Sequence, residues 1–262
     1  MTYAETIHRI ESIIEQALSA WPDEWQGFTW PGYTFEHTLR VRNLSLALAR
    51  RFGADERVVE LAALLHDIGK PAGEPHAEPS AQRAEPVLVE LGIDAPTRQR
   101  VLHAIANHIT CDPAHPVENL ALYDADLIDA NFGYIAFTRF ITIRAHRAAP
   151  IPAMVTEGRD WLVRVQDRAQ KLTNPLSVPV FEGRYAKMQR FYQQLAADLE
   201  AGAGPALALA RFLEADAARP SLARQMSLMQ QAQDGAPVDG LAPSPFLAEA
   251  LVTLRAEIAG EA

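Results

Sequence analysis

Apolar residues recur along most of this chain at spacings of three and four positions, which is typical of amphipathic helices. Within residues 4–18 these positions are Ile7, Ile10, Ile14 and Leu18. From Val58 to Leu65 almost every residue is apolar, which predicts a helix buried on all sides. No stretch longer than four residues alternates apolar and polar positions, as a half-buried strand would. The pattern therefore predicts an all-α protein.

Residues that start and stop helices divide this pattern into segments. Thr34 is the expected N-cap of a helix that ends near Gly53, and Asp55 is the expected N-cap of the next helix. Gly69 and Pro71 stop that second, buried helix. Further helices are expected over residues 80–91, 96–109, 117–145, 154–171 and 182–203, with a structured loop over 21–33. After residue 204 we expect more helices with a break at 234–245.

Composition and charge narrow the functional classes. With 48% hydrophobic residues and no uninterrupted apolar stretch of 18, the chain is globular and predicts no membrane span. Its N-terminal residues do not resemble a signal peptide, and the single Cys111 excludes an intrachain disulfide, so we expect a cytoplasmic protein. The net charge of −9 argues against a nucleic-acid scaffold, although a locally positive pocket could still bind a small anion.

Four polar residues occupy positions where burial is expected. His37 shares a helical stripe with apolar residues, His66 and Asp67 end the buried helix, and Asp126 lies on the segment 117–145. Burying such groups costs a few kcal/mol unless a partner compensates them. A divalent cation can pair with all four at once. Two imidazoles and two carboxylates suit Mn, Fe, Co, Ni, Zn or Mg, with coordination positions left for water.

Three motifs around these residues resemble the HD superfamily of metal-dependent phosphohydrolases. They are EHTLRV around His37, LAALLHDIGK at 61–70 and LYDADLIDANFG at 122–133. The family pattern of one His, an adjacent His-Asp pair and a later Asp maps onto His37, His66, Asp67 and Asp126. The resemblance is strongest over residues 34–145, and KLTNPLSVPVFEGRYAKMQRF is similar to the tail of small bacterial HD hydrolases.

The resemblance implies a domain organisation. We expect an HD-type helical bundle, with its N-terminal helix, over residues 1–203. Residues 204–262 would form additional C-terminal helices of unknown role.

The same family has variants in which further histidines hold a second metal ion. His76 and His108 are the candidates here; His108 shares a stripe with apolar residues and is preferred to His103. If neither binds a metal, either could donate a proton to the leaving oxygen. Asp67 is expected to orient or deprotonate the attacking water. Whether the site holds one metal ion or two is therefore left open.

Three cationic side chains could grip a phosphate: Arg40, Lys70 and Arg139. Arg40 and Lys70 also have structural interpretations, as a surface ion pair for Arg40 and as a favourable charge at a helix C-terminus for Lys70. Arg139 is the weaker candidate. Asp124, about 200° around the helix from Asp126, is expected to face solvent or to accept structural hydrogen bonds.

The preferred function is metal-assisted hydrolysis of a phosphate ester or anhydride of a small molecule, with a nucleotide as the favoured substrate. Two alternatives remain. A di-iron oxygenase acting on a small polyol or phosphonate would need both His76 and His108 as ligands. A non-catalytic nucleotide sensor would keep the metal and lose turnover. Substrate, metal identity and oligomeric state are left open by the sequence.

Overall fold

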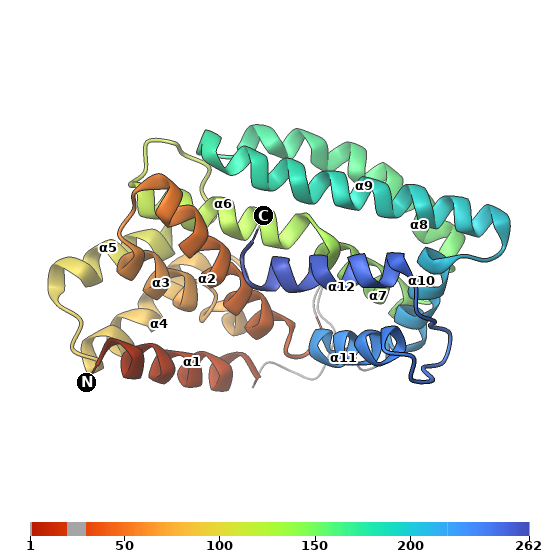
Figure 1. Ribbon diagram of the computed structural model, residues 1–262. Helices are drawn as coiled ribbons and strands as arrows, with labels where there is room; N and C mark the ends of the chain where they lie inside the picture. Colours follow the sequence, from red (N-terminus) through yellow and green to blue (C-terminus); the bar gives the residue numbers. More distant parts are fainter. Residues whose placement is uncertain (1, 20–29, 219, 262) are drawn as a thin grey trace. The chain divides into compact units, whose positions relative to one another are not determined.

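The computed structural model describes residues 2–19, 30–218 and 220–261, and the regular elements of these residues are helices (Figure 1). Within these described residues, one isolated bridge joins Val238 and Leu241. The all-α prediction is confirmed. Of the loop predicted at 21–33, residues 21–29 lie outside the described residues. Within those residues no helix has the length and apolar character that crossing a membrane requires.

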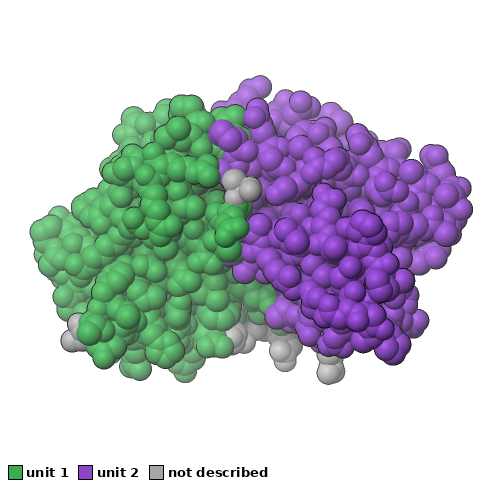
Figure 2. All heavy atoms as spheres, viewed as in Figure 1, with its two compact units in different colours: residues 1–130, 171–178, 259–261 green, residues 131–170, 179–258, 262 purple. Residues whose placement is uncertain are grey.

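The chain forms two compact units, coloured separately in Figure 2. Unit 1 comprises residues 1–130, 171–178 and 259–261, and unit 2 comprises residues 131–170, 179–258 and 262. This division differs from the boundary at 203/204 expected from the sequence, which concerned the extent of the HD-type domain and stays a prediction.

Unit 1 is built around a short buried helix. Its helices are α1 (Tyr3–Ser19), α2 (Tyr33–Phe52), α3 (Glu56–Leu65), α4 (Ala77–Glu90), α5 (Ala95–Ala106) and most of α6 (Val117–Asn131). Helices α1, α2, α4 and α5 all pack against α3, whose residues Val58, Val59 and 61–65 are fully buried. The predicted buried helix is therefore the centre of unit 1, and its C-terminal end delivers His66 and Asp67 into the interior.

Unit 2 is also helical. Its elements are α7 (Tyr134–His146), α8 (Ile151–Gln166), α9 (Val178–Ala201, from residue 179), α10 (Pro205–Ala215), α11 (Leu222–Gln233) and α12 (Pro245–Ile258). Helix α7 packs against α8, α10 and α12. The break expected at 234–245 is confirmed by the gap between α11 and α12.

Two of the three predicted caps are present. The Asp55 carboxylate accepts hydrogen bonds from the backbone N–H groups of Arg57 and Val58, and Gly53 ends α2 with a left-handed φ of 71°. The prediction of Thr34 as an N-cap is wrong. Helix α2 begins at Tyr33 after Gly32, whose φ of 82° turns the chain into the helix without a side-chain cap.

The long helix predicted over 117–145 is wrong, because the chain breaks between α6 and α7. Gly133 adopts a φ of 104° there, and the buried Glu257 carboxylate of α12 accepts hydrogen bonds from the backbone N–H groups of Tyr134 (2.9 Å) and Ile135 (3.0 Å). These two donors would otherwise be unsatisfied at the start of α7. The capping carboxylate compensates for interrupting the helix.

Candidate metal centre

Five segments of unit 1 bring histidine and aspartate side chains together. They are α2, the end of α3, the loop before α4, the turn after α5, and α6. Asp67, 1% exposed, lies at the centre of this group. Its carboxylate oxygens are approached by the Nε2 atoms of His76 (3.0 Å), His66 (3.3 Å), His37 (3.9 Å) and His108 (4.0 Å). Together with Asp126, these residues are called the His/Asp cluster below.

Asp126 enters the cluster through His37. Its Oδ1 lies 3.0 Å from His37 Nε2, and its side chain, at 24% exposed, is the most accessible of the six. One ligand atom each from His37, His66 and Asp126 lie within 4.8 Å of one another, and so do those of His66, Asp67 and His108. Each of the two sets is compact enough to hold one cation.

The four histidines are oriented in the same way. In each ring Nδ1 faces an oxygen that can only accept a hydrogen bond, so Nδ1 carries the proton. The acceptors are Asp129 Oδ2 for His37 (2.7 Å), the Ala63 carbonyl for His66 (2.7 Å), Glu74 Oε2 for His76 (2.6 Å) and the Ile105 carbonyl for His108 (2.7 Å). In the neutral rings all four Nε2 lone pairs are therefore directed into the cluster.

The convergence of these lone pairs on one place indicates a site for a cation. The Nε2 atoms of His76 and His108 lie 3.0 Å apart, a repulsive arrangement for two lone pairs unless a proton or a metal ion lies between them. His66 Nε2 is fully buried and makes no hydrogen bond. Buried polar atoms almost always have a partner. The donor set of imidazole nitrogens and carboxylate oxygens suits a divalent transition metal.

The two oxygens of Asp67 face different members of the cluster. Oδ2 lies toward His37, His66 and the Lys70 ammonium group, which is 2.5 Å away. Oδ1 lies toward His76 and His108. One carboxylate can thus serve two neighbouring positions, one shared with His37 and Asp126 and the other with the two additional histidines.

Electrostatics favour ionised carboxylates around His37. Burial alone would lower the pKa of His37, but hydrogen bonds with Asp126 and Asp129 raise that pKa to about 10. Burial opposes ionisation of Asp126 as well, yet the hydrogen bond to His37 and the charge of that ring lower the pKa of the carboxyl. The pair therefore carries opposite charges when no metal is bound.

The other side of the cluster behaves differently. Burial, reinforced by the nearby His66, lowers the pKa of His108 to about 4, so this imidazole is neutral at neutral pH. Burial opposes the ionised form of Asp67, but His66 and Lys70 hold the pKa of that carboxyl well below its usual range. An ionised carboxylate beside a neutral imidazole is ready to bind a cation.

The three predicted phosphate-binding cations have different surroundings. Lys70 is half-buried beside Asp67, at the edge of the cluster. Arg40 is 3% exposed and directs its Nε and one terminal nitrogen at Asp129, each at 3.1 Å. Arg139 lies on α7 in unit 2. The phosphate-binding role of each stays a prediction.

Sequence reasoning did not assign the partners that orient the histidines. Asp129 follows Asp126 by three positions and so lies on the same helix face, which is a readable signal. Glu74 precedes His76 by two positions in a loop, where spacing carries no such information. Asp124 is fully buried and accepts hydrogen bonds from Thr173 and Ser177, which makes it the structural acceptor that was one of its two expected roles.

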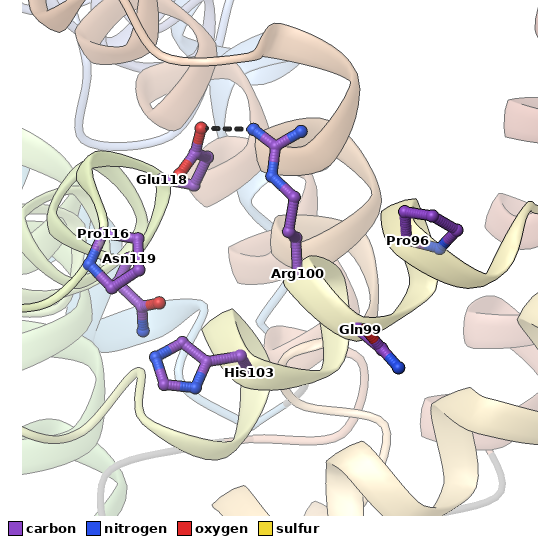
Figure 3. A pocket seen from close by; sticks show the side chains of 7 residues that line it. All are labelled: Pro96, Gln99, Arg100, His103, Pro116, Glu118 and Asn119. Carbon is purple, nitrogen blue, oxygen red and sulfur yellow. Dashed lines mark hydrogen bonds and ion pairs between the residues drawn. The ribbon is translucent and has the colours of Figure 1, made fainter.

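A separate cavity of about 440 Å³ lies between α5 and the start of α6 (Figure 3). It is lined by Pro96, Gln99, Arg100, His103, Pro116, Glu118 and Asn119, none of which belongs to the His/Asp cluster. Figure 3 shows the Arg100 guanidinium pointing at Glu118, 2.6 Å away. The exposed His103 thus lines this cavity, whereas His108 lies in the cluster.

Comparisons with known proteins agree with this architecture. The family model of the HD domain matches residues 34–131. A predicted HD superfamily hydrolase from an uncultured Thermotogales bacterium is 25% identical, with a TM-score of 0.55 over 76% of this chain and 99% of its own. An HD-superfamily hydrolase from Bacillus thuringiensis is 22% identical, with a TM-score of 0.57 over 76% of this chain and all of its own.

A third similar structure is that of Bacillus subtilis YpgQ in complex with ADP. It is 20% identical and has a TM-score of 0.58 over 76% of this chain and 97% of its own. At this identity the likeness concerns the fold. The matched segment 34–131 contains all six residues of the His/Asp cluster, in the order and helical placement already described. Residues 34–131 of the chain accordingly match the HD domain family.

Proposed function

We propose that this protein is a metal-dependent phosphohydrolase that cleaves a phosphate ester or anhydride of a small molecule at the His/Asp cluster. The observation that carries the proposal is the common orientation of the four histidines, with Nδ1 hydrogen-bonded outward and Nε2 directed at Asp67. Such outward bonds are typical of histidines that ligate metals. A divalent ion, when bound, activates water and polarises a phosphoryl oxygen.

Two ions are proposed rather than one. His37, His66 and Asp126 would hold the first, while His76 and His108 would hold the second, with Asp67 shared between them. The division of partners between the two oxygens of Asp67 supports this assignment. In this arrangement both additional histidines are ligands, and the proton for the leaving oxygen would have to come from another group or from water.

The protein's own residues would supply orientation and charge. Asp67 would orient the attacking water, because its ionised carboxylate is at the centre of the cluster. Lys70 would neutralise the charge that develops on the phosphoryl oxygens, since its ammonium group lies at the edge of the same site. Phosphoryl transfer depends chiefly on such positioning and charge neutralisation.

A nucleotide is the favoured substrate class. The structurally similar YpgQ was solved with ADP, a compound whose diphosphate has the chemistry that the cluster and Lys70 would accept. The fold itself does not select a substrate.

The test is a metal-supplemented phosphatase screen over nucleotides and small phosphometabolites, run beside elemental analysis of the untreated protein. We expect bound transition metal and release of phosphate or pyrophosphate from at least one nucleotide. His66→Ala and Asp67→Asn should each lose metal and turnover together, because each removes a central ligand. His103→Ala is the matched control and should keep both, since this exposed histidine lies outside the cluster. Full activity of His66→Ala, or turnover without metal, would refute the assignment.

A further inference from the structure

A buried chain of hydrogen bonds supports His37 from the side that faces away from Asp67. His37 Nδ1 donates to Asp129 Oδ2 at 2.7 Å. Arg40 then donates to both oxygens of the same carboxylate, from Nε to Oδ1 and from a terminal nitrogen to Oδ2, each at 3.1 Å. His37 and Arg40 are 3% exposed and Asp129 is 1% exposed. The three side chains thus form one desolvated unit.

Helix geometry explains why these residues meet. His37 and Arg40 are three positions apart on α2, and Asp126 and Asp129 are three positions apart on α6, so each pair shares a face of its helix. His37 contacts both aspartates, whereas Arg40 contacts Asp129. Two carboxylates of the same kind therefore have different surroundings. Asp126 remains accessible to a cation, while Arg40 neutralises Asp129.

The aromatic ring of Tyr33 covers the same assembly. It is stacked on the His37 ring, with centroids 6.0 Å apart and planes within 10°, and the Arg40 guanidinium carbon lies 5.3 Å from its centroid. A guanidinium held against an aromatic face and paired bidentately with a carboxylate has little freedom to turn toward a substrate.

We propose that Asp129 is a positioning residue that fixes His37 as the Nδ1–H tautomer and so presents its Nε2 lone pair to the metal, with Arg40 holding Asp129 in place. This proposal rests on the function proposed above. Asp129 does not itself need to reach the ion. Its contribution is the direction of the ring and the choice of tautomer, both of which are set by a hydrogen bond that only an acceptor at Nδ1 can make.

The decisive variant is Asp129→Asn. An amide has one acceptor oxygen and one NH₂ group, so it cannot accept from His37 and from both nitrogens of Arg40 at once. With its NH₂ group toward the ring, the amide would favour the opposite tautomer, in which Nε2 carries the proton and cannot bind a metal. Asp124→Asn is the matched control, because Asp124 is another buried carboxylate of α6 that bonds to residues 173–177 instead of His37.

Two measurements are needed on the full chain. Histidine ¹⁵N chemical shifts of the EDTA-treated protein, recorded with rising pH until the His37 ring is neutral, report its tautomer, and titration calorimetry with Mn²⁺ reports metal affinity. For Asp129→Asn we expect the Nε2–H form and an affinity lower by about 10- to 100-fold. Asp124→Asn should keep the Nδ1–H form. An unchanged tautomer in folded Asp129→Asn, or Mn²⁺ affinity within about twofold of the unaltered chain, overturns the proposal.

Arg40→Lys keeps the proposal testable should Asp129→Asn fail to fold. Lysine retains the charge but loses the bidentate fork, so we expect a mixture of His37 tautomers and an affinity between those of the unaltered chain and Asp129→Asn. Unchanged tautomer and affinity in Arg40→Lys would then overturn the proposal. The metal-free spectra also separate the two hypotheses. If the unaltered chain binds no Mn²⁺, the proposed function fails, whereas the tautomer of His37 still decides the role of Asp129.

Discussion

At the scale of single residues, the chemistry of the cluster depends on which nitrogen of each histidine is engaged elsewhere. Two of the outward partners are backbone carbonyls one turn back along the chain, from Ala63 and Ile105. The other two are carboxylates, of which Asp129 is buried and Glu74 is exposed. A carboxylate partner makes the ring a stronger base than a carbonyl does. The histidines are thus alike in orientation but unequal in basicity.

This inequality predicts how metal binding depends on pH. The metal-free protein raises the pKa of His37 to about 10, so this ring is protonated at neutral pH and must lose a proton when it binds an ion. His108, with its pKa lowered to about 4, is already neutral and releases none. Apparent affinity for the ion held by His37 should therefore rise with pH and fall as the pH drops.

Calorimetric titration with Mn²⁺ between about pH 6.5 and 8.5 measures this effect. Repeating the titration in buffers of different ionisation enthalpy gives the number of protons released on binding. We expect proton release on binding and an affinity that grows by up to about tenfold per pH unit for each proton displaced. Affinity that does not change over this range would contradict the prediction.

The principal residues of the cluster could be predicted from the sequence because each is polar at a position that helical spacing marks as buried. His37 and Asp126 lie on apolar stripes, and His66 and Asp67 follow the buried helix whose residues 58–65 are almost all apolar. What the sequence could not show is which helix faces which. Arg40 was therefore considered for phosphate binding, although its donors point at Asp129 across the α2–α6 interface.

At the scale of helices and turns, the connection from α3 to α4 is unusually close-packed. Gly69 lies in the turn that follows Asp67, and its N–H donates to Ser80 Oγ of α4 at 2.9 Å. A Cβ atom at residue 69 would lie 2.5 Å from Ser80 N and 2.7 Å from Ser80 Oγ. Glycine is required here by the approach of α4, since its φ of −86° is open to any residue.

Gly69→Ala should consequently destabilise the protein. Forcing extra atoms into a packed site typically costs about 1–3 kcal/mol. Gly183→Ala on α9 is the matched control, because nothing lies within 4 Å of its added Cβ and alanine favours helix more than glycine by about 1 kcal/mol. Urea denaturation should show opposite shifts of the midpoint for the two variants. Equal stability of Gly69→Ala and the unaltered chain would contradict this prediction, because it would show that α4 can shift to make room for the added methyl group without loss of stability.

The helix that was wrongly predicted as continuous shows that a helix boundary can depend on residues far away in the sequence. Residues 117–145 are periodic throughout, yet Glu257 caps the start of α7 from a position 123 residues beyond Tyr134. Periodicity and local propensity contain no information about so distant a carboxylate. By contrast, the caps at Gly53 and Asp55 act on their immediate neighbours, and both were predicted.

At the scale of the whole molecule, the candidate chemistry belongs to one of the two units. The six cluster residues lie in unit 1, whereas α10, α11 and α12 lie in unit 2. A ligand stabilises the elements that bind it, by about 2.7 kcal/mol at a free concentration 100 times the dissociation constant. Metal binding should therefore stabilise the helices of unit 1 that hold the ion more than the helices of unit 2.

Hydrogen exchange followed by mass spectrometry measures that inequality peptide by peptide. With saturating Mn²⁺ we expect slower exchange in α2, α3 and α6, and unchanged exchange in α10–α12. The His66→Ala variant serves as the control, because Mn²⁺ should no longer protect α2, α3 and α6 once a central ligand is missing. Uniform protection across both units would mean that they respond to the ion as one cooperative body.

The backbone passes between the two units several times, and this limits how the chain can be shortened. The backbone leaves or enters unit 1 at residues 130/131, 170/171, 178/179 and 258/259. Trimming everything after residue 203 would also remove Gly260, where an added Cβ would lie only 2.5 Å from the backbone of Asn43 on α2. A single protease cut at one of these crossings divides the chain in two but leaves the other crossings intact, so it does not separate the two units. A minimal version of unit 1 would have to be made by internal excision and rejoining.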